Sequence, residues 1–584
     1  MSSPLPFLLS SSSRSLLSLG TSIAMAIAIA FGSSACEESV DRRGILASPK
    51  ATNANGLSER GPTKKSPDVD DPTSDEAPLS SPPPVAGDGG LPTKVPAASF
   101  VSASNCSRCH KTIYDQWTRS MHSRALTTPL TMAQTNEITR RGIMKVTNPD
   151  GRRICINCHA PNAALVTKDT EESLPLPKES LGDEGVACQS CHQFAGKPAS
   201  GGGGYSTAYQ KGLAPGRTVF GTLPDPVATP FHDSKSSDAF VRPNTMCANC
   251  HNVNYDNNHD GIIAKGTDLV LQQTWDEYVT TYRLFGGQET CVTCHMPALS
   301  GMTRVADGAN IGSDQAKDAP PRTVRDHTFV GVDYALEDAE QTARTRPARE
   351  ALLKGAATIF IDGNSITATE SNVAFTVTVG NTGTGHNLPS GFAFARQMWL
   401  EVKATGLLGE LVGFSGVLAK PTDDLCDADT LNDLGSPTRR FVQGCAVPDS
   451  PLVNLQQKLV DQVQLSLANG LKFDALLQPV IEQGFFGKEA FLQQPKGGAV
   501  QRTRVADGLK MGTLKPFEFK NFAYDLPTFA KPVRLTVRLL FRNLPPYLLR
   551  TLASTQTAAD GPALAPLVDR LETIEMGRAD FLVL

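Results

Sequence analysis

Residues 106–110 read Cys-Ser-Arg-Cys-His, and the same Cys-x-x-Cys-His spacing returns four more times by residue 295. The motif cysteines are Cys106, Cys109, Cys155, Cys158, Cys188, Cys191, Cys247, Cys250, Cys291 and Cys294. The histidines that complete the five motifs are His110, His159, His192, His251 and His295. These motifs take ten of the 13 cysteines, so any interpretation of the chain has to explain them.

This spacing has a chemical reason. Two thiols three residues apart on one helical turn can both form thioethers with the vinyl groups of one haem, and the adjacent histidine can bind its iron. Zinc knuckles seldom place histidine directly after the second cysteine in every copy. A redox-active Cys-x-x-Cys pair normally occurs once, in a βαβ context that the sequence lacks. The motifs therefore predict five covalently attached haem c groups.

The other five histidines are candidates for the second axial position on each iron. They are His122, His232, His259, His327 and His386. One per haem permits bis-histidine coordination throughout, which leaves no open iron and suits electron transfer. His259 lies in the polar loop 257–260, so it is either a distal ligand or an ordinary surface histidine. In the second case one iron would be five-coordinate. His386 lies in the glycine-flanked loop 383–391, which could carry an imidazole into a neighbouring domain.

The N-terminal residues indicate export. Residues 1–36 read as a signal peptide, with an interrupted apolar stretch that is too short for a typical membrane span. Cys36 follows Ser34-Ala35 and resembles the modified cysteine of a bacterial lipobox, although Ser33 stands where leucine is usual. We expect a lipid anchor at Cys36, in the periplasm or at the outer-membrane surface. The alternative is a soluble periplasmic protein that is cleaved near Ala35.

Composition divides the remaining chain into three segments. Residues 37–99 are rich in Pro, Ser, Asp and Gly, and they predict a disordered tether. Residues 100–346 contain all five motifs and little regular hydrophobic pattern. They predict a loop-rich, mostly α multihaem domain with short helices such as 111–126 and 272–284, in which the porphyrins would form the apolar interior.

Residues 347–584 have a different pattern. Apolar residues alternate with polar ones over 373–379 and 533–541, which predicts a β-sandwich domain. We expect helical insertions, including Leu452–Leu467, and a short helix that begins at Pro545-Pro546. Cys426 and Cys445 could form a disulfide or remain as two free thiols.

Several segments resemble the cytochrome superfamily that contains hydroxylamine oxidoreductase and its tetrahaem electron-acceptor cytochrome. They are Trp117–Ala125, Glu184–Val186, Met246 and Cys294–Pro297. Asp326-His327 and Gly385–Gly391 also resemble segments of lipoprotein or periplasmic multihaem cytochromes with a C-terminal β-sandwich, and the resemblance extends more thinly to Val533–Arg550. The resemblance implies that His122 and His327 are distal ligands and that the haems pack in near contact. Hydroxylamine oxidoreductase, however, has eight haems, and pentahaem nitrite reductase uses a Cys-x-x-Cys-Lys site that this chain lacks.

The favoured function is electron transfer between redox partner proteins whose identity the sequence does not give. The alternative is a multihaem oxidoreductase that acts on a small nitrogen or sulfur compound at one open iron. A gas sensor would need a signalling domain. The tether and the β-sandwich alone do not exclude a role in adhesion. The formal net charge of −4 argues against a nucleic-acid partner.

Overall fold

The computed structural model describes residues 100–140, 154–166, 181–193, 218–227, 229, 231–237, 243–255, 269–308, 319–428, 431, 439–456, 458–460, 478–479, 492–493, 501–503, 512–527 and 531–584. The predicted signal peptide (1–36), the predicted tether (37–99) and His259 lie outside the described residues. In the described part of the chain no helix combines the length and apolarity that a bilayer-spanning segment needs.

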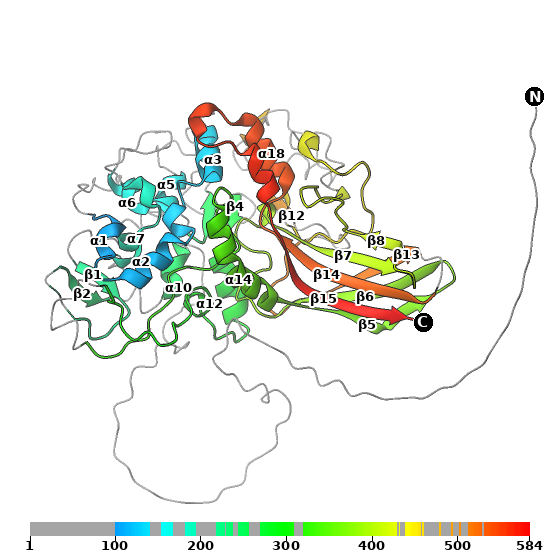
Figure 1. Ribbon diagram of the computed structural model, residues 1–584, viewed down its shortest axis with the longest axis horizontal. Coiled ribbons are helices and arrows are strands. Elements are labelled where there is room, and N and C mark those ends of the chain that lie inside the picture. Colours follow the sequence, from blue (N-terminus) through cyan, green and yellow to red (C-terminus); the bar gives the residue numbers. More distant parts are fainter. Residues whose placement is uncertain are drawn as a thin grey trace, which may run out of the picture.

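The region from residue 100 to about 338 is loop-rich and helical (Figure 1). Its helices are α1 (Ala103–Cys106), α2 (Lys111–Thr118), η2 (His122–Arg124), α3 (Pro129–Arg140), α5 (Ile154–His159), α6 (Pro161–Val166), η4 (Gly182–Glu184), α7 (Cys188–His192), α10 (Pro243–Ala248), α11 (Thr274–Glu277), η5 (Tyr278–Arg283) and α12 (Cys291–His295). Two small ladders pair β1 (Thr218–Gly221) with β2 (Asp233–Ser236), and β3 (Val253–Tyr255) with β4 (Leu269–Gln272).

The apolar clusters of this region are small. One joins Ala103, Trp117 and Ala187, and another joins Trp275 and Tyr278 to Ala248. Clusters of this size cannot organise a region of this length, which agrees with the expectation that its interior is completed by bound groups.

The helix expected over residues 111–126 divides into two. α2 ends at Thr118, and the short η2 begins at His122. The Ser120 and Ser123 hydroxyls donate to the backbone carbonyls of Trp117 and Ser120, at 2.7 and 2.9 Å. Because serine hydroxyls that bind nearby carbonyls compete with a continuing helix, the chain turns here and redirects His122.

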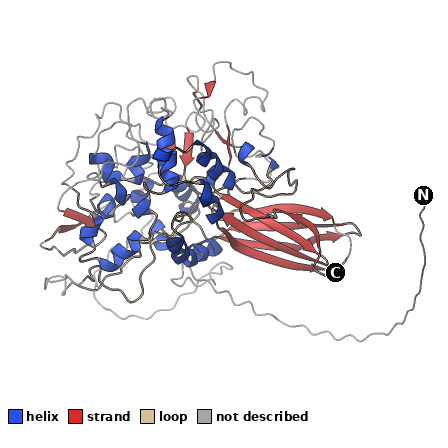
Figure 2. Ribbon diagram, turned by 45° about the horizontal axis from the view of Figure 1, so that its top comes forward, coloured by secondary structure: helices blue, strands red, loops and turns tan. Residues whose placement is uncertain are grey.

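Two antiparallel sheets make up most of the C-terminal region (Figure 2). The first has the order β13 (Phe519–Pro527), β6 (Asn372–Asn381), β5 (Ala357–Ala368), and the second has the order β15 (Thr573–Val583), β14 (Val533–Arg542), β7 (Gln397–Thr405), β8 (Leu411–Ser415). Their inward residues form one hydrophobic cluster, to which β6 contributes Phe375, Val377 and Val379. The alternation expected over 373–379 and 533–541 is therefore present in β6 and β14.

Shorter elements complete this region. They are η6 (Ala393–Ala395), η7 (Arg439–Phe441), β9 (Lys458–Val460), β10 (Gln478–Pro479), β11 (Leu492–Gln493), β12 (Gln501–Thr503), α18 (Pro546–Thr555), η8 (Ala558–Asp560) and η9 (Ala565–Arg570). The helix expected at Pro545-Pro546 is α18, and Pro546 stands at its first position, where a missing N–H costs nothing.

The helix predicted over Leu452–Leu467 is wrong where the structure describes it. Residues 453–455 extend along the edge of β7, with Leu400 N–H donating to Val453 O at 3.1 Å and Leu455 N–H donating to Met398 O at 2.7 Å. β9 follows directly, and residues 461–467 lie outside the described part. The apolar spacing that suggests a helix here instead reflects side chains buried against the sheet, because the edge of β7 offers these residues backbone partners.

One helix links the two regions. α14 (Ala339–Ala356) runs through the boundary expected at residues 346 and 347, although it contains Pro347. Its Arg349 is almost fully buried, lies 4.1 Å from the ring centre of Tyr334 and forms a 2.9 Å ion pair with Glu572, next to the start of β15. The loop-rich region is therefore fastened to the sheets through a buried cation.

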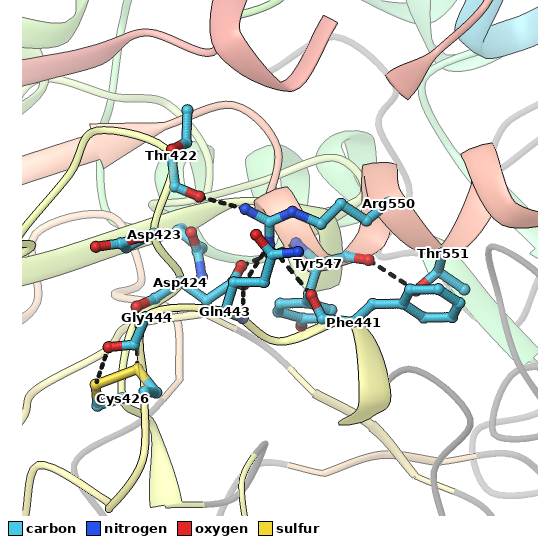
Figure 3. Close-up of polar contacts among 12 residues, drawn as sticks. Thr422, Asp423, Asp424, Cys426, Phe441, Gln443, Gly444, Tyr547, Arg550 and Thr551 are labelled. Carbon is cyan, nitrogen blue, oxygen red and sulfur yellow. Dashed lines mark hydrogen bonds and ion pairs between the residues drawn. A yellow bond between two sulfur atoms is a disulfide. The ribbon is translucent and has the colours of Figure 1, made fainter. Parts of the chain in front are cut away.

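A second buried charge cluster holds α18 against the sheets (Figure 3). The Asp424 carboxylate accepts from Tyr547 N–H at 2.8 Å and pairs with Arg550 at 2.7 Å. Because Pro545 and Pro546 lack N–H groups and a capping side chain, Asp424 supplies the acceptor at this helix N-terminus. Burial raises the pKa of Asp424, although its hydrogen bonds and the nearby arginines act against that rise.

The loop that carries Asp424 is closed by a disulfide. Cys426 and Cys445 are bonded, with 5.2 Å between their Cα atoms, so of the two alternatives for this pair the structure has the disulfide. The Cys445 sulfur also lies 3.2 Å from Asp424 O. The bond ties the two ends of the loop beside the buried carboxylate.

We predict that Arg550→Met destabilises the C-terminal region by about 3 kcal/mol, because it leaves the Asp424 charge buried without its cation. The matched control is Arg578→Met. Its partner Asp580 is largely exposed, so the loss should stay below about 1 kcal/mol. Amide hydrogen exchange in β14 and α18 measures the free energy of opening. Equal losses in the two variants would contradict a structural role for the buried pair.

Candidate haem sites

Each Cys-x-x-Cys-His motif lies on a short helical turn. The second, third and fifth motifs fall inside α5, α7 and α12. In the first and fourth, a helical hydrogen bond of 2.9 Å extends the turn, from His110 N–H to Cys106 O and from His251 N–H to Cys247 O. Because residues three apart share one face of a helix, both thiols of a motif point to the same side.

Residues inside the motifs start some of these helices. In α12 the Thr293 hydroxyl accepts from Thr290 N–H at 2.7 Å, while Thr290 accepts from Thr293 N–H at 3.2 Å. In α7 the Ser190 hydroxyl accepts from Ala187 N–H at 3.1 Å. The polar x residues of these motifs therefore satisfy backbone groups at the helix start, in the manner of a capping box.

The motifs open into one continuous cavity of about 3540 Å³, which is lined by nine of the ten motif cysteines and by every described histidine. Pockets for a single drug-sized ligand occupy about 300–1,000 Å³, so this cavity can hold several porphyrin-sized groups. Eight cationic side chains and three carboxylates line it. The cations are Arg108, Lys235, Arg304, Arg322, Arg325, Lys354, Arg396 and Arg578, and the carboxylates are Asp333, Glu289 and Glu350. An excess of cations suits the propionate groups of haem.

Eight of the nine described histidines form four facing pairs. The ring centres are 6.3 Å apart for His110 and His232, 6.5 Å for His192 and His327, 6.4 Å for His295 and His386, and 6.3 Å for His251 and His122. The first three pairs are nearly parallel, with interplanar angles of 24°, 24° and 16°, whereas the rings of the fourth cross at 65°. Each pair joins one motif histidine to one of the other histidines.

These separations fit a shared metal ion. With each imidazole nitrogen about 2 Å from the ion and the ring centre roughly 1.2 Å behind it, two imidazoles on opposite sides of one ion have centres about 6.4 Å apart. Direct stacking of two rings would bring them closer. The residues present therefore fit bis-histidine iron sites. His159 is the ninth described histidine, and the remaining candidate partner, His259, lies outside the described residues.

Backbone carbonyls orient most of the motif histidines. A carbonyl oxygen lies 2.6–2.7 Å from Nδ1 in four of them: Val305 O for His110, Ala125 O for His159, Phe220 O for His192 and Val330 O for His295. An Nδ1–H that donates to a carbonyl leaves Nε2 as the free lone pair for a metal. Arg325 O and Asn387 O take the same position beside His327 and His386, at 2.8 and 2.9 Å.

Burial lowers the pKa of seven of the described histidines, namely His122, His159, His192, His251, His295, His327 and His386. It lowers the pKa of His122 to about 3, with His251 adding to the effect, and it lowers the pKa of His192 to about 4. His251 faces the cavity and is surrounded by protein, which lowers its pKa to about 4. A neutral imidazole is the form that binds a metal, so burial favours the ligand state at neutral pH.

The loop that carries His386 reaches from the sheets to the loop-rich region. The Glu277 carboxylate of α11 accepts from Asn387 N–H at 3.2 Å and from the Ser390 hydroxyl at 2.5 Å. At Gly383 a Cβ atom would lie 1.8 Å from Gly355 O, so only glycine fits where this loop passes α14. The expected delivery of an imidazole by a glycine-flanked loop therefore matches the geometry, in which His386 faces His295.

The motif thiols show which sites are neighbours. Thiols of different motifs lie side by side in three places, with Cys106 beside Cys188, Cys250 beside Cys158, and Cys247 beside Cys291. Burial, and then the nearby thiols of Cys247 and Cys250, raise the pKa of Cys191 to about 12. The first motif is therefore next to the third, and the fourth is next to the second, third and fifth.

Sequence reasoning does not find the groups that orient the histidines. The carbonyls of Val305, Ala125 and Val330 carry no sequence signal, because every residue has one. Gln272 lies 3.3 Å from Nδ1 of His251, and Phe329 lies 4.4 Å from the ring centre of His122. Phe329 follows the predicted ligand His327 by two residues, which is the one signal that could have suggested it.

The family profile described as "Cytochrome c554 and c-prime" matches residues 105–193, which include the first three motifs. Among solved structures, a penta-heme cytochrome c552 from Thermochromatium tepidum matches with 18% identity and a TM-score of 0.48, covering 84% of this chain and 100% of that one. The search of curated proteins found no match. The profile match and the five motifs support a multihaem cytochrome c that binds haem c and transfers electrons.

We predict that His386→Ala converts one haem to the high-spin state while the haem content stays the same, because His295 loses its facing imidazole. Electron paramagnetic resonance of the oxidised protein, together with a pyridine haemochrome assay, checks both parts. Thr384→Ala is the matched control in the same loop, and it should leave all low-spin signals in place. A His386→Ala protein that is entirely low-spin would show that this residue does not bind iron.

Proposed function

We propose that this chain is an exported pentahaem c-type cytochrome that moves electrons through closely packed, mainly bis-histidine haems. The observation that carries the proposal is the set of four histidine pairs with ring centres 6.3–6.5 Å apart inside one cavity. The proposed axial ligands are the five motif histidines together with His122, His232, His259, His327 and His386. On this proposal the two C-terminal sheets form a β-sandwich that supplies His386.

Haem c supplies reversible one-electron chemistry at its iron. The residues of the chain determine how each iron would be coordinated and how its ligands are oriented. Each pair of imidazoles would hold an iron from both sides, which would leave that iron no coordination position for a substrate. Carbonyl contacts at Nδ1 orient four of the motif histidines, so electron transfer would require little rearrangement of these ligands.

The neighbouring thiols support transfer between sites. Contacts between thiols of the first and third motifs, and from the fourth to the second and fifth, bring the attachment points of different haems together. A thioether sulfur lies at the porphyrin edge, so adjacent sulfurs imply adjacent porphyrins. Short edge distances favour tunnelling of single electrons from one site to the next.

The location and the partners are part of the proposal. Covalent haem attachment outside the cytoplasm agrees with the signal peptide expected at residues 1–36. A lipid on Cys36 and the segment 37–99 would hold the cytochrome at a membrane surface. Donor and acceptor would be redox proteins that approach the edges of the cavity.

A multihaem oxidoreductase is the second candidate, and His159 is the observation that favours it. Its Nδ1 is held 2.6 Å from Ala125 O, as in the paired motif histidines, but it is the described histidine that stands outside the four pairs. If His259 does not face it, the iron of the second motif is open. Such an iron could bind a small nitrogen or sulfur compound.

We expect the purified holoprotein to take up five electrons per chain in a coulometric reductive titration, and its intact mass to exceed that of the mature polypeptide by five haems. Addition of carbon monoxide to the reduced protein should leave its spectrum unchanged, because every iron carries two imidazoles. His259→Ala is the informative variant, and it should create one carbon monoxide-binding haem. Binding of carbon monoxide to the wild-type protein would favour the oxidoreductase instead.

A further inference from the structure

We propose that Phe329 and Gln272 hold the His122 and His251 imidazoles crossed, and that the fourth site is thereby an electronically distinct junction of the haem network. This inference rests on the proposed function, because it requires both rings to bind one iron. It goes beyond that function by assigning one site a different role and by naming two residues that position its ligands.

The crossing of the rings distinguishes this pair. Its interplanar angle is 65°, whereas the three other described pairs lie between 16° and 24°. Its ring centres are nonetheless 6.3 Å apart, like those of the other pairs, so the difference is a rotation of one plane against the other.

Phe329 fixes the plane of His122. The edge of one ring meets the face of the other at an angle of 69°, with 4.4 Å between their centres. The same Phe329 ring lies 5.6 Å from that of His327, at 82°. Phe329 thus lies between ligands of the third and fourth sites, with a positive φ of 48° that residues other than glycine seldom adopt. Rotation of His122 toward the plane of His251 would drive it against this ring.

Gln272 sets the plane of His251. Four other motif histidines place Nδ1 against a backbone carbonyl, but here Nε2 of the Gln272 amide lies 3.3 Å from Nδ1, and a half-turn of that amide would bring its oxygen to accept the Nδ1 proton of an iron-bound His251. The same amide reaches the Thr274 hydroxyl at 3.5 Å, and Gln272 itself is buried. A side chain at the end of β4 therefore directs this imidazole, so its direction is independent of the carbonyls that align the others.

The fourth site also has the most neighbours among the motifs. Cys250 lies beside Cys158 of the second motif, and Cys247 lies beside Cys291 of the fifth. Cys191 of the third motif lies close to both fourth-motif thiols. Electrons that pass between the first and third sites on one side and the second and fifth sites on the other would therefore cross the fourth.

Crossed planes change the electronic structure of a low-spin iron. The filled π orbital of an imidazole stands perpendicular to its ring and mixes with one of two iron d orbitals. When the two rings are parallel, both mix with the same iron d orbital, so the two d orbitals differ in energy. When the rings are crossed, each ring mixes with a different d orbital, so the two d orbitals stay close in energy. Two d orbitals of nearly equal energy give the ferric iron a strongly anisotropic electron paramagnetic resonance signal with a large maximal g value. Near-equal orbital energies also remove part of the stabilisation of the ferric form, so the junction should have a more positive reduction potential than a parallel site.

The test is electron paramagnetic resonance of the oxidised full-length holoprotein, with haem counted by pyridine haemochrome. We expect a large-g low-spin signal that integrates to about one haem per chain, beside rhombic signals from the parallel sites. Phe329→Leu and Gln272→Leu should each reduce the large-g signal by at least half, with a matching gain in rhombic signal, because the rings can then turn toward parallel.

Two matched controls separate positioning from general disturbance. Phe517 also lines the cavity and has a positive φ of 63°, but it stacks on Tyr282, so Phe517→Leu should leave the signal unchanged. Gln288 lines the cavity at an exposed position and serves as the control for Gln272 when replaced by leucine.

Absence of a large-g signal from wild-type protein, or a signal that survives both variants at full strength, would overturn the inference. If either Phe329→Leu or Gln272→Leu loses haem, the large-g signal of the other variant still tests the inference. A haem count below five in the wild-type protein would contradict the proposed pentahaem function. The large-g signal and its response to the two variants would still test whether the His122 and His251 rings are crossed.

Discussion

On the proposed function, the structure depends on pairs of imidazoles that face each other at the separation that one metal ion would set. The surrounding protein lowers the pKa of most of these rings, which favours the neutral imidazole, and the free nitrogen of that imidazole needs a partner. A facing imidazole alone cannot satisfy that nitrogen at 6.3–6.5 Å, but an iron between the two can. The short helices and long loops of the N-terminal region follow from this constraint, because four such pairs join segments that have few apolar contacts of their own.

The C-terminal region is organised differently, and the two parts are nevertheless interdependent. The sheets have a continuous apolar core, and a second cluster joins the fully buried Trp399 to Leu425, Leu452 and Leu540. The loop of His386 is anchored in the sheet by Asn381 and in the helices by Glu277. On the proposed function, this loop would connect the core of the sheets to the fifth haem site. Buried Arg349 adds a second connection through α14. The sheets thus act as a support for an axial ligand and not only as a separate module.

Local patterns were enough to predict the parts of this arrangement that local chemistry determines. The Cys-x-x-Cys-His spacing identifies both thiols and one imidazole of each site, and period-two alternation identifies β6 and β14. Pairing was beyond the sequence, because His110 and His232, or His192 and His327, are more than a hundred residues apart along the chain. The expected helix at 452–467 failed for a related reason, since whether an apolar segment becomes helix or strand depended on the free edge of β7. Phe329 and Gln272 belong to no sequence motif, so the sequence did not predict their roles.

The order of the sites in space does not follow their order in the chain, and this has a functional consequence. A linear arrangement would give each interior site two neighbours, but the thiol contacts give the fourth site three. The family match ends at residue 193 and so includes only the first three motifs. His251, Phe329, Gln272 and the His386 imidazole from the sheets therefore lie beyond that match, whereas His122 lies inside it. A branched network can accept electrons at one edge and release them at either of two others, so the residues that fix the junction control how the branches are used.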